Sequence, residues 1–354
     1  MIAYKTPMNL KHRTSIIAII LAVVFAACSQ KPTSNNTTST SQPSGKVRIG
    51  FAMDALKQER WQKDRDLFLK RAAELGADVI LQTADGSDEA QMKQVESLLT
   101  QGIDVLVIVP HNAEVAGAMV EMAKKQGVPV VSYDRLVKNS APDLYVSFDN
   151  ERVGELQAKY LFEKAPTGNY VLIGGAPTDN NSLLLRKGQL NILQPAIDSG
   201  AIKVVADQWA KEWLAEEALK HAENALTQNN NNVAAMVVSN DGTAGGAIEA
   251  LKSQGLAGKV FVSGQDAELG ALQRIVAGSQ SMTVYKPISR LAPTAVEAAI
   301  ALAKKEKLNT TRTVNNGKID VPSILVEPIT IDKNNVDVVI NDGFQKREDV
   351  YKKP

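Results

Sequence analysis

Two residue types that build metal and redox sites are scarce in this chain. Its 354 residues include one cysteine and three histidines, too few for the usual zinc sites, iron–sulfur clusters or disulfide frameworks. None of His12, His111 and His221 has a catalytic partner at a useful spacing. We therefore expect no metal and no cofactor.

An excess of charge of either sign is also lacking. Lys and Arg number 40 and Asp and Glu number 39, which gives a net charge of +1. Nucleic-acid binding needs a basic excess, and a strongly acidic chain tends to stay unfolded, so both classes are excluded. The chain is 44% hydrophobic and 22% charged, as is typical of globular proteins. At roughly 150 residues per domain, its length predicts about two domains.

A long hydrophobic run is missing as well, although a short one lies near the start. The apolar run 16–27 has twelve residues, whereas a membrane-spanning helix needs about 20. It follows Lys5, Lys11 and Arg13 with no acidic residue between them, a pattern typical of a secretory signal peptide. We predict that residues 1–27 are removed, which leaves 37 basic and 39 acidic residues and a net charge of −2.

The single cysteine, Cys28, follows two alanines at the predicted cleavage site. One interpretation is a buried thiol. The other is lipidation, because small residues before a cysteine resemble the lipobox of bacterial lipoproteins, although Phe25 replaces the leucine preferred there. Residues 28–46 are mostly Ser, Thr, Asn, Gln and Pro and form a predicted flexible tether. We expect an exported protein, on the periplasmic or cell-surface face, that contacts the membrane only through a lipid on Cys28.

From residue 47 onward, short β-branched runs alternate with amphipathic stretches, as in repeated βαβ units. Strands are expected at 47–53, 78–82, 104–109, 128–133 and 145–148, and again at 170–174, 202–207, 234–238, 260–263 and 282–285. Helices are expected at 61–75, 88–101, 114–126, 151–164, 182–197, 214–227, 243–254, 268–277 and 290–304, followed by an irregular tail.

This pattern predicts an α/β protein with two doubly wound parallel-sheet lobes. One lobe comprises residues 47–150 plus about 289–320, and the other comprises residues 151–288 plus about 321–354. Chain crossings near residues 150, 288 and 320 would form a hinge of several strands. Because such sheets bind ligands beyond the carboxyl ends of their strands, two facing lobes would share one cleft.

Polar, charged and indole side chains follow almost every predicted strand. Sugar hydroxyls both donate and accept hydrogen bonds, so a sugar site needs carboxylates, cationic donors and amides. The C–H face of a sugar ring packs against an aromatic ring. The strand-end residues of these types are Arg60, Trp61, Asp134, Arg135, Asn181, Arg186, Trp213, Asn240, Asp266 and Lys286.

Each of these residues also has a purely structural interpretation. Trp61 and Trp213 could be core residues, and Asp134 and Asn240 could be helix N-caps. The cationic residues could be solvated surface groups. Their joint occurrence at one predicted sheet edge nevertheless favours a binding site.

Six stretches of the sequence carry a family resemblance: ERWQKDRD (59–66), SFDNERVGELQAK (147–159), NALTQNNN (224–231), SNDGTAGGAIEAL (239–251), SGQDAEL (263–269) and MTVYKPI (282–288). They resemble the ribose-type periplasmic sugar-binding proteins of bacterial ABC transport, and within that family the D-xylose-binding group. The likeness runs from about residue 47 to 346 and implies the periplasmic binding protein type I fold. It also implies that the ten residues above contact the sugar, with a pyranose stacked between Trp61 and Trp213. Lys286, where ribose binders tend to have an amide, favours the xylose group.

We therefore expect a monomeric, lipid-anchored receptor that captures a pentose, D-xylose, by lobe closure and delivers it to an ABC transporter permease, without catalysis. The alternative is an exported glycosidase that uses Asp134 and Asp266 as its carboxylate pair. Against it, the nearby Arg135, Arg186 and Lys286 would lower the pKa of both carboxyls, whereas a general acid needs a raised pKa.

Overall fold

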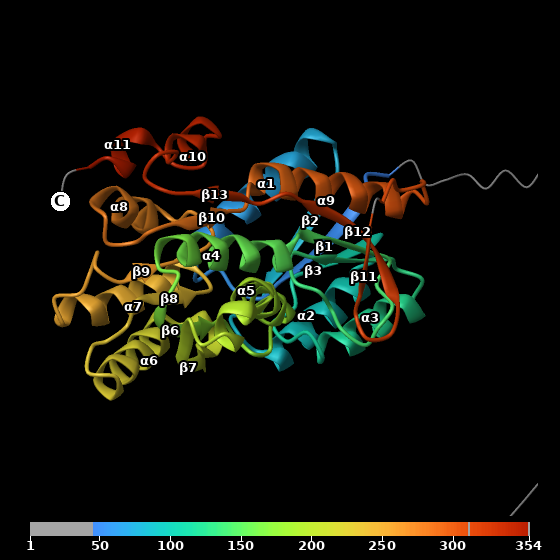
Figure 1. The fold of residues 1–354 in the computed structure, drawn as a ribbon. Helices are drawn as coiled ribbons and strands as arrows, with labels where there is room; N and C mark the ends of the chain where they lie inside the picture. The colour runs from blue at the N-terminus through green and yellow to red at the C-terminus, as the bar shows by residue number, and fades with distance from the viewer. Residues whose placement is uncertain (1–44, 311, 353–354) are drawn as a thin grey trace, which may run out of the picture. The chain divides into compact units, whose positions relative to one another are not determined.

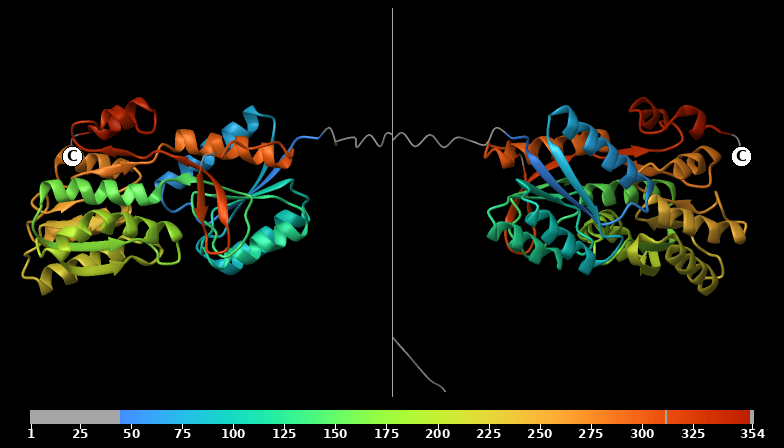
Figure 2. Two further views of the ribbon diagram at one scale, coloured as in Figure 1. Left: turned by 45° about the vertical axis from the view of Figure 1, so that its right-hand side comes forward. Right: turned by 180° about the vertical axis from the view of Figure 1, so that it is seen from behind.

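Two parallel β-sheets, each covered by helices on both faces, make up most of the structure (Figures 1 and 2). This computed structural model describes residues 45–310 and 312–352. The predicted signal peptide (1–27), Cys28 and residues 29–44 of the predicted tether lie outside the described residues. The predicted α/β fold with two doubly wound lobes is confirmed.

The sheet of the first lobe has seven strands in the order β11-β12-β5-β4-β3-β1-β2, parallel except for β11. The strands are β1 (Arg48–Met53), β2 (Asp78–Thr83), β3 (Val105–Ile108), β4 (Val130–Tyr133), β5 (Leu144–Phe148), β11 (Arg312–Asn315) and β12 (Asp320–Val326). The helices are α1 (Glu59–Glu74), α2 (Asp88–Thr100), α3 (Ala116–Lys125) and α9 (Ile288–Ala303). Strand side chains alternate between two cores, since Phe51 packs with the α1 and α9 side and Ala52 with the α2 and α3 side.

The sheet of the second lobe has the order β7-β6-β8-β9. Its strands are β6 (Gly168–Gly174), β7 (Ile202–Trp209), β8 (Ala235–Val238) and β9 (Phe261–Val262). Its helices are α4 (Asn150–Lys164), α5 (Asn180–Asp198), α6 (Ala215–Gln228), α7 (Asp241–Ser253) and α8 (Leu269–Ala277). Leu172 packs with the α4 and α5 core and Ile173 with the α6 and α7 core. Both faces are buried, which explains the continuous apolar runs in these strands.

The chain crosses between the lobes three times. It crosses from β5 to α4, from β10 (Thr283–Tyr285) to α9, and from β12 to β13 (Ile329–Ile331). The third crossing therefore follows residue 326 rather than residue 320. The reason is that β12 pairs with β5, with Ile324 opposite Val146, and so stays in the first sheet.

The tail after α9 is regular, which corrects the expectation of an irregular segment. Strands β11 and β12 form an antiparallel pair, and β13 pairs antiparallel with β10. Two short helices follow, α10 (Asp337–Asn341) and α11 (Arg347–Val350), and α11 lies beside α8 of the second lobe (Figure 1). Within α10, Val339 is buried.

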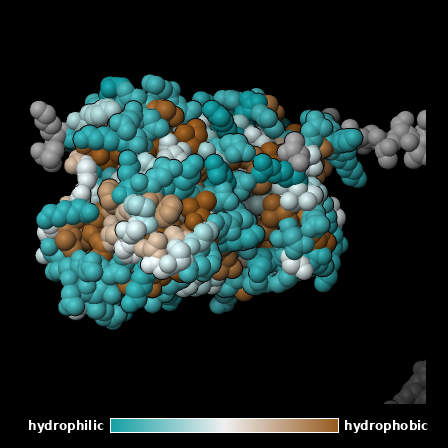
Figure 3. Space-filling model, in the orientation of Figure 1, coloured by the Kyte–Doolittle hydropathy of each residue, from teal (hydrophilic) through white to brown (hydrophobic). Residues whose placement is uncertain are grey.

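Hydrophilic side chains cover most of the face shown in Figure 3, and the apolar groups on it are broken up by polar residues. Among the residues that the structure describes, the large apolar side chains that are exposed are Leu75, Val115, Leu183, Val338 and Tyr351. Within the described residues, no helix is both long and apolar enough to cross a membrane.

Candidate functional site

A cavity with an empty volume of about 310 Å³ lies where the carboxyl ends of the two sheets face each other. Its lining comprises Gln58, Arg60, Trp61, Asp134, Arg135, Asp179, Asn181, Trp213, Asn240, Gln265, Asp266 and Lys286.

Nine of the ten residues singled out in the sequence line this cavity, and Arg186 does not. The guanidinium of Arg186 pairs with Asp207, donates from Nε to Gln189 Oε1 at 3.0 Å, and lies 4.8 Å from the ring centre of Trp209. Arg186 is buried rather than solvated. The sequence predicts that Arg186 lies one turn into a helix, but not which way the helix is rotated. In the structure this rotation points the side chain toward β7.

Gln58, Asp179 and Gln265 line the cavity in addition to the predicted residues. Each lies within two positions of a residue that the sequence did single out. Asp179 is also the N-cap of α5, where its Oδ1 accepts from the backbone N–H of Asn181 at 2.9 Å. Their place in the same strand-end loops could have identified them, since neighbouring residues of such a loop approach the cavity together.

Three of the lining residues have left-handed backbone conformations. The φ angles are +59° at Asp134, +60° at Trp213 and +96° at Asp266. Such conformations cost non-glycine residues about 1–3 kcal/mol each, and they concentrate at functional sites. The fold therefore tolerates local strain at the positions where these side chains enter the cavity.

Alternating charges make up one wall of the cavity. Nη2 of Arg60 donates to Asp134 Oδ2 at 2.9 Å and to Asp64 Oδ2 at 2.8 Å, and Nη1 lies 3.6 Å from Asp266 Oδ1. Nζ of Lys286 lies 3.2 Å from Asp266 Oδ1 and 3.9 Å from Asp134 Oδ2. All five side chains are almost completely buried, so each charge needs its neighbours in the low-dielectric interior.

These neighbours decide the charge state of Asp134. Burial alone would raise the pKa of Asp134, but the cations Arg60, Lys286 and Arg135 hold it below its usual value. Burial alone would lower the pKa of Arg60, but the neighbouring carboxylates raise it. Asp134 is therefore an ionised acceptor, whereas a general acid for glycoside cleavage would need a raised pKa.

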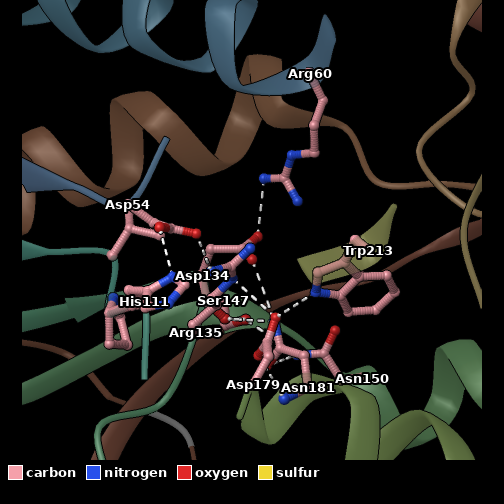
Figure 4. A network of polar contacts seen from close by, with 12 residues as sticks. Asp54, Arg60, His111, Asp134, Arg135, Ser147, Asn150, Asp179, Asn181 and Trp213 are labelled. Atoms are coloured by element: carbon pink, nitrogen blue, oxygen red, sulfur yellow. Dashed lines mark hydrogen bonds and ion pairs between the residues drawn. The ribbon is translucent and has the colours of Figure 1, made fainter. Parts of the chain in front are cut away.

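The two lobes touch directly beside the cavity through Asn181 and Asp134. Nδ2 of Asn181, at the start of α5, donates to the backbone oxygen of Asp134 at 3.1 Å and to its Oδ1 at 3.2 Å. In return, Oδ1 of Asn181 accepts from Asn150 Nδ2 at 3.0 Å (Figure 4). Asp134 follows β4 of the first lobe, so these bonds join the two sheets at their carboxyl ends.

The two indoles occupy different surroundings. Trp61 belongs to the core of the first lobe as well as to the cavity wall, and the Arg60 guanidinium lies 4.2 Å from its ring centre. Trp213, in the short 3₁₀ helix Lys211–Trp213, covers the backbone of Gly175, where a Cβ would lie only 2.2 Å from the ring. The core interpretation thus applies in part to Trp61.

Asn240 combines capping with a place in the cavity wall. Its Oδ1 accepts from the backbone N–H of Thr243 at 3.0 Å and so caps α7, as the structural interpretation of this residue predicted. Asn240 also lines the cavity. The cap fixes the orientation of the amide, so its oxygen serves the helix and its nitrogen is left for other partners.

A second, larger hollow of about 900 Å³ adjoins the first and shares Gln58, Arg135 and Trp213 with it. Nη1 of Arg135 donates to Asp54 Oδ2 at 2.7 Å, and Asp54 Oδ1 lies 2.8 Å from Nδ1 of His111. The hydrogen bond to Asp54 raises the pKa of His111.

The lining of the first cavity is electrically balanced. It holds as many cations as carboxylates, namely Arg60, Arg135 and Lys286 against Asp134, Asp179 and Asp266. A balanced lining favours an uncharged ligand with many donors and acceptors. Within residues 45–310 and 312–352, no group of three or more His, Cys, Asp or Glu side chains is arranged to hold a metal ion.

Comparison with known proteins gives consistent results. The family model described as "Periplasmic binding protein domain" matches residues 49–307. The chain is 55% identical over 314 residues to the D-xylose-binding periplasmic protein of Haemophilus influenzae, a match that covers 88% of this chain and 95% of that protein. It is 54% identical to the protein of the same description from Escherichia coli, with the same coverage of both chains.

A solved structure shares the fold. The carbohydrate transporter solute-binding protein of Chloroflexus aurantiacus, in complex with D-glucose, superimposes with a TM-score of 0.82 at 32% identity. The match covers 86% of this chain and 98% of that one.

Proposed function

The chain belongs to the periplasmic binding protein domain family and has the type I fold, and on this premise we propose that it captures a pentose, D-xylose, in the cavity between its lobes. The relatives in Haemophilus influenzae and Escherichia coli are described as D-xylose-binding. We propose that the nine predicted residues that line the cavity contact the sugar. Arg186, which pairs with Asp207 outside the lining, supports them without such a contact.

The observation that carries this proposal is the charge-balanced cavity with its two indoles. The carboxyl oxygens of Asp134 and Asp266 are acceptors for sugar hydroxyls, and Arg60, Arg135 and Lys286 are donors. The apolar face of a pyranose packs against an indole, as that of Trp213. A charged ligand would add a net charge to a buried lining whose three cations and three carboxyl groups already balance.

Capture follows from contacts that exist only in the closed state. With the lobes apart, the strand-end groups are hydrated, and a sugar on one lobe makes only part of its hydrogen bonds. Closure about the three chain crossings adds the contacts of the other lobe, and the sugar favours closure by that difference in binding free energy.

The expected affinity is within reach of so small a ligand. A pentose has about ten heavy atoms, and a ceiling of about −1.5 kcal/mol per atom allows no more than roughly −15 kcal/mol. A micromolar dissociation constant needs about −8 kcal/mol.

Isothermal titration calorimetry with D-xylose, L-arabinose, D-ribose and D-glucose tests the proposal. We expect micromolar or tighter binding of D-xylose and weaker binding of the others. Tighter binding of another sugar would reject the specificity, and no heat with any sugar would reject the function.

We also propose that Cys28 carries a lipid and that the closed receptor delivers its sugar to a membrane permease of the ABC type. The support is the sequence around Cys28 and the transport role of the family. In cells, the Cys28→Ser variant should leave the membrane fraction while its purified head binds sugar as before. Retention of that variant in the membrane fraction would contradict the anchor.

A glycosidase remains the alternative function, and the charges of the cavity argue against it. The lowered pKa of Asp134 suits an acceptor rather than a proton donor. Release of xylose from aryl xylosides by the purified protein would overturn our preference.

A further inference from the structure

Asp179 is a buried carboxylate that holds three of the residues around the cavity. It is 3% exposed. Its Oδ1 accepts from the backbone N–H of Asn181 at 2.9 Å. Its Oδ2 accepts from Nε1 of Trp213 at 3.2 Å and lies 2.8 Å from Nε of Arg135 (Figure 4). Both oxygens are therefore occupied by groups of the protein itself.

These contacts join the two lobes. Asp179 follows β6 and Trp213 follows β7 in the second lobe, whereas Arg135 follows β4 in the first. Arg135 is held on the first lobe, because its Nη1 donates to Asp54 at 2.7 Å and to the backbone oxygen of Pro110 at 3.2 Å. Its Nε reaches across to Asp179 in the second lobe.

The same carboxylate also fixes an aromatic ring. The indole of Trp213 packs on one side against the backbone of Gly175, so closely that a Cβ at position 175 would lie 2.2 Å from the ring. Its N–H bond to Asp179 fixes the rotation of the ring within its plane. Without that bond, a buried N–H would lack a partner, and the ring would be free to turn away from the cavity.

We propose that Asp179 is a positioning residue that sets the indole of Trp213 and couples it to closure of the lobes through Arg135. This inference rests on the proposed sugar-binding function. When the lobes separate, Asp179 and Arg135 are each hydrated. When they close, both are buried and the ion pair forms, so an intact Asp179 stabilises the closed state that encloses the ligand. Asp179 acts through Arg135 and Trp213 and needs no contact with the sugar.

The test compares Asp179→Asn with a matched control, Asp143→Asn. Asp143 also accepts from a backbone N–H, that of Val130 at 2.8 Å, and pairs with a lysine, Lys124, but it does so within the first lobe and outside the cavity lining. Each variant is titrated with D-xylose by calorimetry. Dissociation is followed by stopped-flow tryptophan fluorescence, and compaction by small-angle X-ray scattering with and without sugar.

We expect Asp179→Asn to raise the dissociation constant at least tenfold, mainly through faster dissociation, and to reduce sugar-induced compaction. Asp143→Asn should match the wild type in all three measurements. Wild-type affinity, dissociation and compaction in Asp179→Asn would overturn the inference. A wild-type protein that binds no sugar would instead refute the proposed function, so the two failures are distinguishable.

A double-mutant cycle tests the positioning of Trp213 separately from the coupling of the lobes. Trp213→Phe removes the N–H donor and retains a ring. If Asp179 acts through that donor, the effect of Asp179→Asn on the dissociation constant should be several-fold smaller in the Trp213→Phe background. Strictly additive effects would overturn the positioning of Trp213 by Asp179. If Asp179→Asn does not fold, Arg135→Lys tests the contact between the lobes instead. Full sugar-induced compaction and wild-type dissociation in that variant would overturn the coupling.

Discussion

Oδ1 of Asp266 lies 3.2 Å from Nζ of Lys286, yet it has no hydrogen-bond partner among the described residues. The two groups form an ion pair whose geometry is not that of a hydrogen bond. Asp266 is 7% exposed and has a φ of +96°, so the fold fixes this oxygen in a strained, buried position. A buried acceptor without a donor is costly. In the proposed function, a hydroxyl of the bound sugar donates to this oxygen.

Replacing Asp266 tests this relationship. Asp266→Asn removes the charge of the acceptor and should weaken sugar binding by about 1.5–3 kcal/mol, the usual contribution of a hydrogen bond to a charged group. Calorimetry measures the change, and Asp66→Asn, an exposed carboxylate next to Arg65, is the control. An unchanged affinity would remove Asp266 from the site.

The two indoles should respond differently to truncation. Trp213→Ala should weaken binding by about 1–3 kcal/mol, the size of stacking and area burial, and lower the unfolding free energy by less than Trp61→Ala does. Trp61→Ala should lower the unfolding free energy by about 3–5 kcal/mol as well, because Trp61 is part of the first core. Calorimetry and urea denaturation separate the two effects. Wild-type sugar affinity in Trp213→Ala would assign that residue a purely structural role.

Helices α4 and α5 approach so closely that a side chain would not fit between them. A Cβ at Gly188 would lie 1.9 Å from the backbone oxygen of Glu151. Gly188→Ala should therefore lower the unfolding free energy by about 1–3 kcal/mol through overpacking. At Gly245 in α7 the nearest atom is the flexible Arg274 guanidinium at 3.3 Å, so Gly245→Ala should be neutral or stabilising by up to about 1 kcal/mol. Equal stabilities for the two variants would contradict this packing argument.

Stability should fall as the pH rises through the titration of Asp241. Burial raises the pKa of Asp241 from 3.8 to about 7. Between these two values the folded state retains a proton that the unfolded state has lost, so the unfolding free energy decreases with rising pH. Burial also raises the pKa of Glu268 to about 8, with the same sign.

Chemical denaturation at several values from pH 4 to 8 measures this effect in the wild type and in Asp241→Asn. The wild type should lose stability relative to the variant as the pH rises across that range. The quantity to compare is the slope of the unfolding free energy against pH, because Asn also changes the hydrogen bonds from Gln280 and Thr283. Parallel stability curves would show that Asp241 is not protonated in the folded state.

The sequence determined the elements and the edge of the sheets at which the site lies. Alternating β-branched and amphipathic runs are local signals, and the structure has every strand and helix expected up to residue 304, with small shifts of the ends. The residues after the strands could be singled out because parallel strands bring their carboxyl ends to one edge. The family resemblance then pointed to the same positions.

Only the tertiary structure decided which of those residues meet. The pairing of β12 with β5, the direction of Arg186 toward Asp207, and the contact of Asp179 with both Arg135 and Trp213 join residues far apart in the chain. Such contacts depend on strand order, helix rotation and the angle between the lobes, none of which has a local signature in the sequence. The residue pattern thus predicted a polar cavity with indoles at the strand ends, and the packing of the two lobes decided which side chains line it.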